Sequence, residues 1–195
     1  MNKQTGFTLV EIAIVMVIIG LLLGGVLKGQ QIIVDAKIKN LDNLFNGTTA
    51  AHYTYLDRYQ AIAGDHQTAT AYFTNVSNGD GDRQIGNAFD ASGGEAGSFW
   101  QHLRNAGLVA GAPTDATQPS NPFSGIVGFS TGTAPANGQN ITVLFVGFSN
   151  IPNNIAQIMD TRGDDGVPIT GSIQADQNPY VAGDTDTLFR LFFKL

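Results

Sequence analysis

The hydrophobic residues of this chain are concentrated in one stretch near the N-terminus. Between Phe7 and Leu27 the only charged side chain is Glu11, and most of the other residues are isoleucine, valine or leucine. A helix of about 20 residues crosses the ~30 Å hydrocarbon core of a bilayer. The pattern therefore predicts a membrane-spanning helix over 7–27. Within it, Glu11 is either a functional ionisable group that needs a partner or a charge tolerated near the helix start, where the helix dipole favours an anion.

The helical pattern continues beyond this span. Apolar residues such as Ile33, Leu41 and Phe45 recur at helical spacing, and no proline interrupts the chain before Arg58. We therefore expect one helix over 7–59. Its first half would lie in a membrane or in the core of a filament, and its second half would pack on a soluble head.

Residues 60–195 predict that head. Shorter patterns in this region indicate an amphipathic helix at 95–106 and β-rich segments bounded by glycine at 124–131 and 141–149. One or two further helical turns are expected at 152–159, and a closing strand at 188–195. The expected fold class is α+β, with a small antiparallel sheet packed on the long helix.

Composition and charge exclude several classes of function. Charged residues make up only 13%, the formal net charge is -6, and the lysines and arginines are scattered, so no basic surface for nucleic acid is expected. The absence of cysteine excludes disulfides, thiolate catalysis and cysteine zinc sites. The three histidines do not form an HExxH pair, and no nucleophile elbow or P-loop is present. We therefore do not expect an enzyme.

The sequence GFTLVE, which begins at Gly6, follows a short leader containing Lys3 and precedes the long apolar helix. This arrangement resembles the processing site of type IV prepilins and type II secretion pseudopilins. The resemblance implies that a prepilin peptidase cuts between Gly6 and Phe7, removes residues 1–6 and leaves Phe7 to be N-methylated. It also implies that Glu11 pairs with the terminal amine of a neighbouring subunit.

The function implied is that of a structural subunit of a type IV pilus or pilus-like filament. Its partners would be copies of itself, other pilins, the prepilin peptidase and an inner-membrane assembly platform. The precursor would cross the inner membrane once, and the filament would be extracellular or periplasmic. Many major pilins carry proline where this chain has Lys28. Major pilin, minor pilin and pseudopilin of a type II secretion system all stay open, as does a membrane-anchored ligand-binding protein that uses the helix only as a tether.

One acidic loop has the spacing of a calcium site. Four candidate oxygen ligands follow one another at alternate positions: Asn78, Asp80, Asp82 and the carbonyl of Gln84. Arg83 stands where an EF-hand has glycine, and Phe89 stands where it has a bidentate glutamate, so Asp90 or Glu95 would have to substitute. The alternative is a solvated turn, because turns favour the same residue types.

A second acidic group offers fewer ligands. Asp160, Asp164 and Asp165 lie close in sequence with glycines between and after them. They could bind a separate ion or form a turn, and the sequence leaves both interpretations open.

Overall fold

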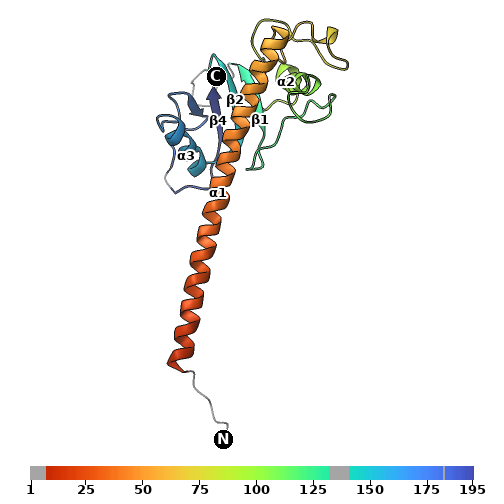
Figure 1. Ribbon diagram of the computed structural model, residues 1–195. Helices are drawn as coiled ribbons and strands as arrows, with labels where there is room; N and C mark the ends of the chain where they lie inside the picture. The colour runs from red at the N-terminus through yellow and green to blue at the C-terminus, as the bar shows by residue number, and fades with distance from the viewer. Residues whose placement is uncertain (1–7, 132–140, 182) are drawn as a thin grey trace. The chain divides into compact units, whose positions relative to one another are not determined.

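The computed structural model describes residues 8–131, 141–181 and 183–195. The chain forms two compact units, Met1–Lys39 and Asn40–Leu195. One helix, α1 (Leu9–Tyr59), begins in the first unit and ends in the second (Figure 1). The prediction of a long N-terminal helix is therefore confirmed. The predicted division into leader, helix and head stays a prediction.

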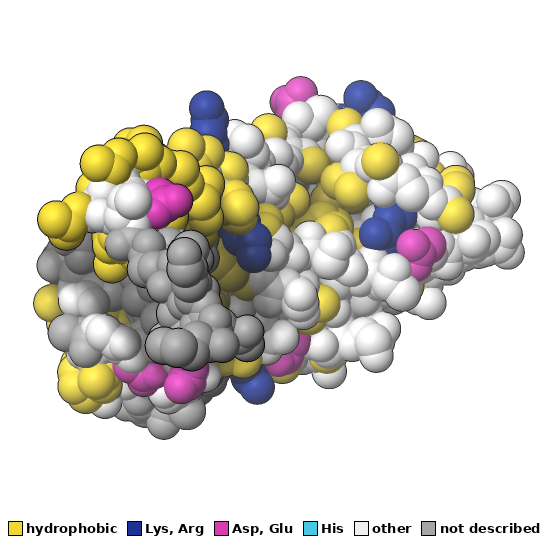
Figure 2. Space-filling model, turned by 90° about the horizontal axis from the view of Figure 1, so that it is seen from below, with side chains coloured by type: hydrophobic (Ala, Val, Ile, Leu, Met, Phe, Trp, Pro, Cys, Tyr) yellow, Lys and Arg dark blue, Asp and Glu magenta, His cyan; other side chains and the backbone are white. Residues whose placement is uncertain are grey.

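In the first unit the apolar side chains of α1 are exposed. Leu9 is 90% exposed and Leu21 is 74% exposed, and none of the most apolar 18-residue window is buried within the chain. Figure 2 shows hydrophobic side chains gathered at the surface around the N-terminal end of α1. By length and composition, this helix could cross a membrane.

In the second unit the same helix is buried on one face. Leu41 and Tyr55 are fully buried. The Phe45 ring lies 5.2 Å from that of Phe193, and the His52 ring lies 4.8 Å from that of Phe129. These contacts pack the second half of α1 on the sheet, because period-3.6 spacing brings its apolar residues to one side.

The sheet is antiparallel throughout and has four strands in the order β1-β2-β4-β3. The strands are β1 (Val127–Thr131), β2 (Leu144–Pro152), β3 (Ile173–Ala175) and β4 (Leu188–Lys194). The two remaining α-helices, α2 (Gly94–Asn105) and α3 (Asn153–Gly163), lie on opposite sides of the second half of α1 in Figure 1. This arrangement confirms the α+β fold class.

Some boundaries differ from the predicted ones. The strand expected from residue 124 begins at Val127, because Ser124 has a φ of 63° and a Cβ on Gly125 would lie only 2.0 Å from the Ser149 carbonyl oxygen. The turns expected at 152–159 are the beginning of α3, which continues to Gly163. Strand β3 was not predicted, because a three-residue strand has too short a pattern to detect.

The core between α2 and the sheet is aromatic. The Phe99 and Phe129 rings stack 4.1 Å apart with an interplanar angle of 5°. Phe89 lies across two adjacent strands, where a Cβ on Gly147 would come within 2.5 Å of its ring and a Cβ on Gly128 within 2.0 Å of its carbonyl oxygen. Glycine at these two strand positions therefore admits the close approach of the chain around Phe89.

The segment before Phe89 is fixed to the edge of the sheet. The Thr131 amide of β1 donates to the Ile85 carbonyl at 3.2 Å, and the Ile85 amide donates to the Thr131 hydroxyl at 3.1 Å. The Ser130 hydroxyl also donates to the Ile85 carbonyl at 3.1 Å. Covering an outer strand in this way occupies edge groups that could otherwise pair with another chain. It also holds the preceding acidic loop in place.

Candidate functional site

The processing site predicted at Gly6 and Phe7 lies outside the described residues. The description begins at Thr8, which precedes the first residue of α1. The Glu11 carboxylate accepts the Thr8 amide at 2.8 Å and the Thr8 hydroxyl at 2.7 Å. In return, the Glu11 amide donates to the Thr8 hydroxyl oxygen at 3.3 Å. This reciprocal pair is a capping box, which explains why the helix begins here.

The capping box fixes where the Glu11 charge lies. Its carboxylate is held against the first turn of α1, where the positive end of the helix dipole favours an anion. Both bonds come through one oxygen, Oε2. A carboxylate has about four lone-pair positions. Glu11 can therefore accept a further donor, such as an ammonium group, while it still caps the helix.

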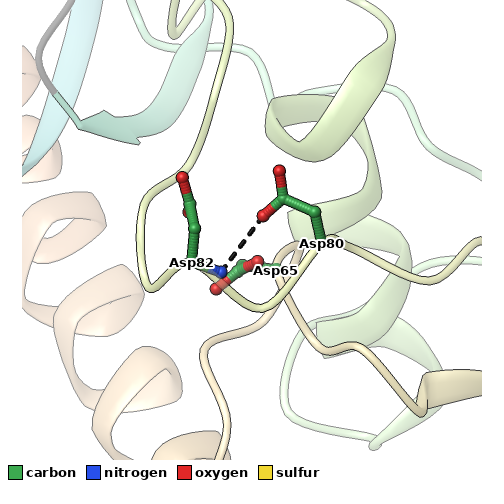
Figure 3. Close-up of side chains that lie close together, drawn as sticks. All are labelled: Asp65, Asp80 and Asp82. Carbon is green, nitrogen blue, oxygen red and sulfur yellow. Dashed lines mark hydrogen bonds between the residues drawn. The ribbon is translucent and has the colours of Figure 1, made fainter.

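The acidic loop brings together three carboxylates. Asp65, Asp80 and Asp82 each offer an oxygen, and these atoms lie within 4.8 Å of one another. In Figure 3 the Asp80 and Asp82 side chains extend from the same loop, and Asp65 approaches it from the neighbouring segment. Oxygen atoms grouped in this way are the ligands that Ca²⁺ uses.

Backbone amides of the loop hold these carboxylates. Asp65 Oδ1 accepts the Gly81 amide at 2.6 Å, and its Oδ2 accepts the Arg83 amide at 2.7 Å. Asp80 Oδ1 accepts the Asp82 amide at 3.1 Å. Because Arg83 and Gly81 both have positive φ, of 66° and 80°, the loop curls around the Asp65 side chain.

The other predicted ligands make different contacts. Asn78 Oδ1 accepts the Thr70 amide at 2.9 Å, and the Gln84 amide donates to Asp82 Oδ1 at 2.7 Å. Of the two proposed substitutes, Glu95 lies beside the loop, because its oxygens accept the Asp80 amide at 3.2 Å and the Gly86 amide at 2.7 Å. Asp90 instead forms an ion pair with Arg190 at 3.5 Å.

Electrostatics favour a cation near this loop. Burial raises the pKa of Asp65, and the neighbouring Asp82 and Asp80 charges raise it further, although two backbone hydrogen bonds act against these effects. Burial also raises the pKa of Glu95, with the charges of Asp65 and Asp80 in the same direction. A bound cation would relieve this repulsion between like charges.

Two histidines connect the loop to the helices. His102 of α2 accepts the Gly64 amide at its Nδ1, at 2.9 Å, and its Nε2 lies 2.9 Å from the Ser77 carbonyl, to which it donates as a neutral ring. The Tyr55 hydroxyl of α1 lies 2.7 Å from His66 Nδ1. Burial lowers the pKa of His102 to about 4, so its ring is uncharged at neutral pH.

Sequence reasoning missed Asp65 and the role of His102. Asp65 lies 15 residues before Asp80, so no local spacing connects them. The signal in the sequence is the adjacent Gly64, because glycine is common in turns. In the structure Gly64 has a φ of 90° and forms a turn that brings the chain back towards α2.

The second acidic group also converges. Asp160, Asp164 and Asp165 offer oxygens within 4.8 Å of one another. However, the fully buried Asp160 accepts the Tyr180 hydroxyl at 2.9 Å and the Gly166 amide at 3.2 Å. Asp164 Oδ2 accepts the Ile173 amide at 3.0 Å. These bonds join the end of α3 to β3, which is what a structural turn requires.

Comparison with known proteins adds one finding. No curated protein and no solved structure matches the chain. Residues 1–27 match the family model described as the prokaryotic N-terminal methylation motif. The match covers the predicted leader, Glu11 and the apolar stretch that the structure leaves exposed. The chain therefore carries the prokaryotic N-terminal methylation motif, the signature of type IV pilins and pseudopilins.

Proposed function

We propose that this protein is a structural subunit of a type IV pilus or pilus-like filament, assembled through the first half of α1. The observation that carries the proposal is the exposed apolar stretch of that helix, which the chain itself does not bury. Each Å² of apolar surface left in water costs about 25 cal/mol. Lipid would cover this surface in the precursor, and copies of the same helix would cover it in the filament.

Glu11 would set how the helices associate. Removal of residues 1–6 by a prepilin peptidase would create an amine on Phe7, which N-methylation leaves basic. A carboxylate and an ammonium are each costly in an apolar core, but the cost falls when they pair. The capping box supports this role, because it holds the Glu11 carboxylate at the end of the helix nearest to Phe7. A neighbouring subunit displaced along the filament would supply the amine.

The proposal also covers location and partners. The precursor would cross the inner membrane once, with the Lys3 side in the cytoplasm. The assembled filament would be extracellular or periplasmic, and its partners would be other pilins and an inner-membrane assembly platform. A type II secretion pseudopilin would use the same helix, and the motif is the signature of both classes.

Replacing Glu11 tests the proposal. The variant Glu11→Gln keeps an oxygen that can cap α1 but removes the charge. We expect normal membrane levels of the processed subunit and loss of at least about 90% of the subunit from sheared filaments, since an unpaired amine would be left in an apolar core. Asp57→Asn, which removes an exposed carboxylate from the other end of α1, is the matched control and should assemble normally.

Two results would contradict the proposal. Normal filament incorporation of Glu11→Gln would show that the helix is only a tether, as in a membrane-anchored ligand-binding protein. A mature chain that begins at Met1 rather than Phe7, by N-terminal sequencing, would remove the amine on which the pairing depends.

We also propose that the acidic loop binds Ca²⁺ through Asp65, Asp80 and Asp82, with Glu95 beside them. The support is the grouping of three carboxylates from two segments of the chain and the raised pKa of Asp65 and Glu95. The contacts of the Asn78 side chain and the Gln84 backbone amide favour a supporting role for these two residues within the loop.

A further inference from the structure

A pocket lies at the end of α1 within the second unit. Its volume is about 750 Å³, which falls in the range of roughly 300–1,000 Å³ typical of small-molecule sites. The last turns of α1 form one wall, the segment that follows the helix forms another, and the acidic loop closes a third side at Gly81 and Arg83. We call it the tyrosine pocket, after Tyr53, Tyr59 and Tyr72 in its lining.

The three tyrosines give the pocket accessible aromatic walls. Tyr53 is 51% exposed and Tyr72 is 60% exposed. The rings of Tyr59 and Tyr72 meet edge to face, with centroids 5.4 Å apart. Large aromatic side chains are usually buried when they only stabilise a fold, whereas an exposed ring in a concave surface can stack on the flat apolar face of a ligand.

The polar groups of the pocket are mostly uncharged. Gln67 and Thr68 line it with an amide and a hydroxyl, and among the described lining residues the charged side chains are those of Asp65 and Arg83. These two charges are opposite, and both Asp65 oxygens already accept backbone amides. The described side chains of the lining therefore offer hydrogen bonds, and their two charges balance.

His52 supplies a second, independent observation. The side chain lines the pocket and is only 2% exposed, and within the described part of the chain its Nδ1 has no hydrogen-bond partner. Burial lowers the pKa of His52 to about 4, so the ring is neutral at pH 7. A buried polar atom without a partner is unfavourable for the folded chain.

We propose that the tyrosine pocket binds a neutral saccharide unit. Sugars present apolar C–H faces, which stack on aromatic rings, and hydroxyl groups, which need donors and acceptors at their edges. Tyrosine rings with a neutral imidazole, an amide and a hydroxyl match both requirements. A strongly anionic ligand fits less well, because Asp80 and Asp82 lie in the loop that closes the pocket. The proposal does not depend on assembly into a filament.

The test uses the full processed chain in lauryldimethylamine oxide micelles, a detergent without a sugar headgroup. Maltose, cellobiose and N,N′-diacetylchitobiose are titrated separately, and the His52 and tyrosine ring signals are followed by NMR. We expect saturable shifts with at least one disaccharide, with a dissociation constant on the order of 1 mM. The titrations are repeated with Ca²⁺ and with a chelator, so that changes in the acidic loop are recognised.

Two variants locate the binding. Tyr72→Ala and Gln67→Ala alter exposed side chains, so both should fold, and each should weaken the saccharide at least about tenfold. Leu188→Ala, at a residue that is 48% exposed and outside the pocket, should bind as the unchanged chain does. Circular dichroism confirms the fold of all three.

Several outcomes would overturn the proposal. They are no saturable shift with any of the three disaccharides, equal binding by Tyr72→Ala and the unchanged chain, and tighter binding of tetramethylammonium or of a sialylated sugar, either of which would show selection for charge. Shifts that grow with protein concentration alone would instead indicate that a second copy occupies the pocket.

Discussion

The two units of this protein use one helix in opposite ways. In the first unit α1 exposes leucine and isoleucine on every side, with Leu22 63% exposed. In the second unit it buries one face, with Leu41 fully buried, and presents polar residues elsewhere. The difference shows that the apolar residues of the first unit do not stabilise the fold of the chain. Their free energy becomes available only when another apolar environment, lipid or a neighbouring subunit, covers them.

The same contrast applies to the carboxylates. Glu11 stands alone in an apolar stretch, where its described bonds come from Thr8. Asp65, Asp80 and Asp82 stand together in a polar loop of the second unit. A single acid in an apolar helix suits pairing with one external cation, whereas three acids in a loop suit a divalent ion. The first of the following tests compares the two units directly, and the other two probe ionisable groups of the second unit.

The largest expected effect is on the stability of the second unit. Leu41→Ala should lower the free energy of unfolding by about 2–5 kcal/mol, because it leaves a cavity beneath α1. Leu22→Ala is the matched control and should leave unfolding unchanged, since its side chain has no packing to lose within the chain. Urea denaturation in micelles measures both. Equal destabilisation by the two variants would contradict the comparison between the units.

Removal of calcium should have the next largest effect. If Ca²⁺ is present at about 100 times its dissociation constant, it adds about 2.7 kcal/mol of stability, which a chelator should remove. Asp80→Asn should abolish this response, whereas Asp165→Asn in the second acidic group should retain it. Thermal melting with and without chelator gives the measurement. An unchanged melting curve after chelation would eliminate the calcium proposal.

The smallest effect concerns pH. Burial lowers the pKa of His52 from 6.5 to about 4. As pH falls below about 6.5, the unfolded chain therefore binds a proton that the folded chain does not, and this histidine's contribution to stability is lost down to about pH 4. His52→Phe should remove this loss of stability at low pH. As the pH is lowered from 7 to 5, the free energy of unfolding of the variant should therefore rise by about 1–2 kcal/mol relative to that of the unchanged protein.

The His52 measurement needs a reference, because burial raises the pKa of Asp65, Glu95 and Asp160 and these groups act in the opposite direction. These three carboxylates are present in the unchanged protein and in His52→Phe, so their effects cancel when the pH profile of one is subtracted from that of the other. Tyr53→Phe, a change at the next residue without a titrating group in this range, should give a profile parallel to the unchanged chain. A His52→Phe profile that is also parallel would contradict the prediction.

The sequence by itself determined the features that depend on near neighbours. The apolar stretch, the long helix and the closing strand all depend on residues a few positions apart, and hydrophobic periodicity reports such spacing directly. The same reasoning identified Asp80 and Asp82 as neighbours, since alternate positions in one loop lie close together in any fold.

Only the tertiary structure decided what distant segments do together. It placed Asp65 beside Asp80, buried His52 and His102, added β3 to the edge of β4, and formed the tyrosine pocket from α1 and two loops. These outcomes follow from how the second half of α1, α2 and the sheet fill one core. Close packing of large aromatic rings is set by the whole set of contacts, so no local pattern encodes it.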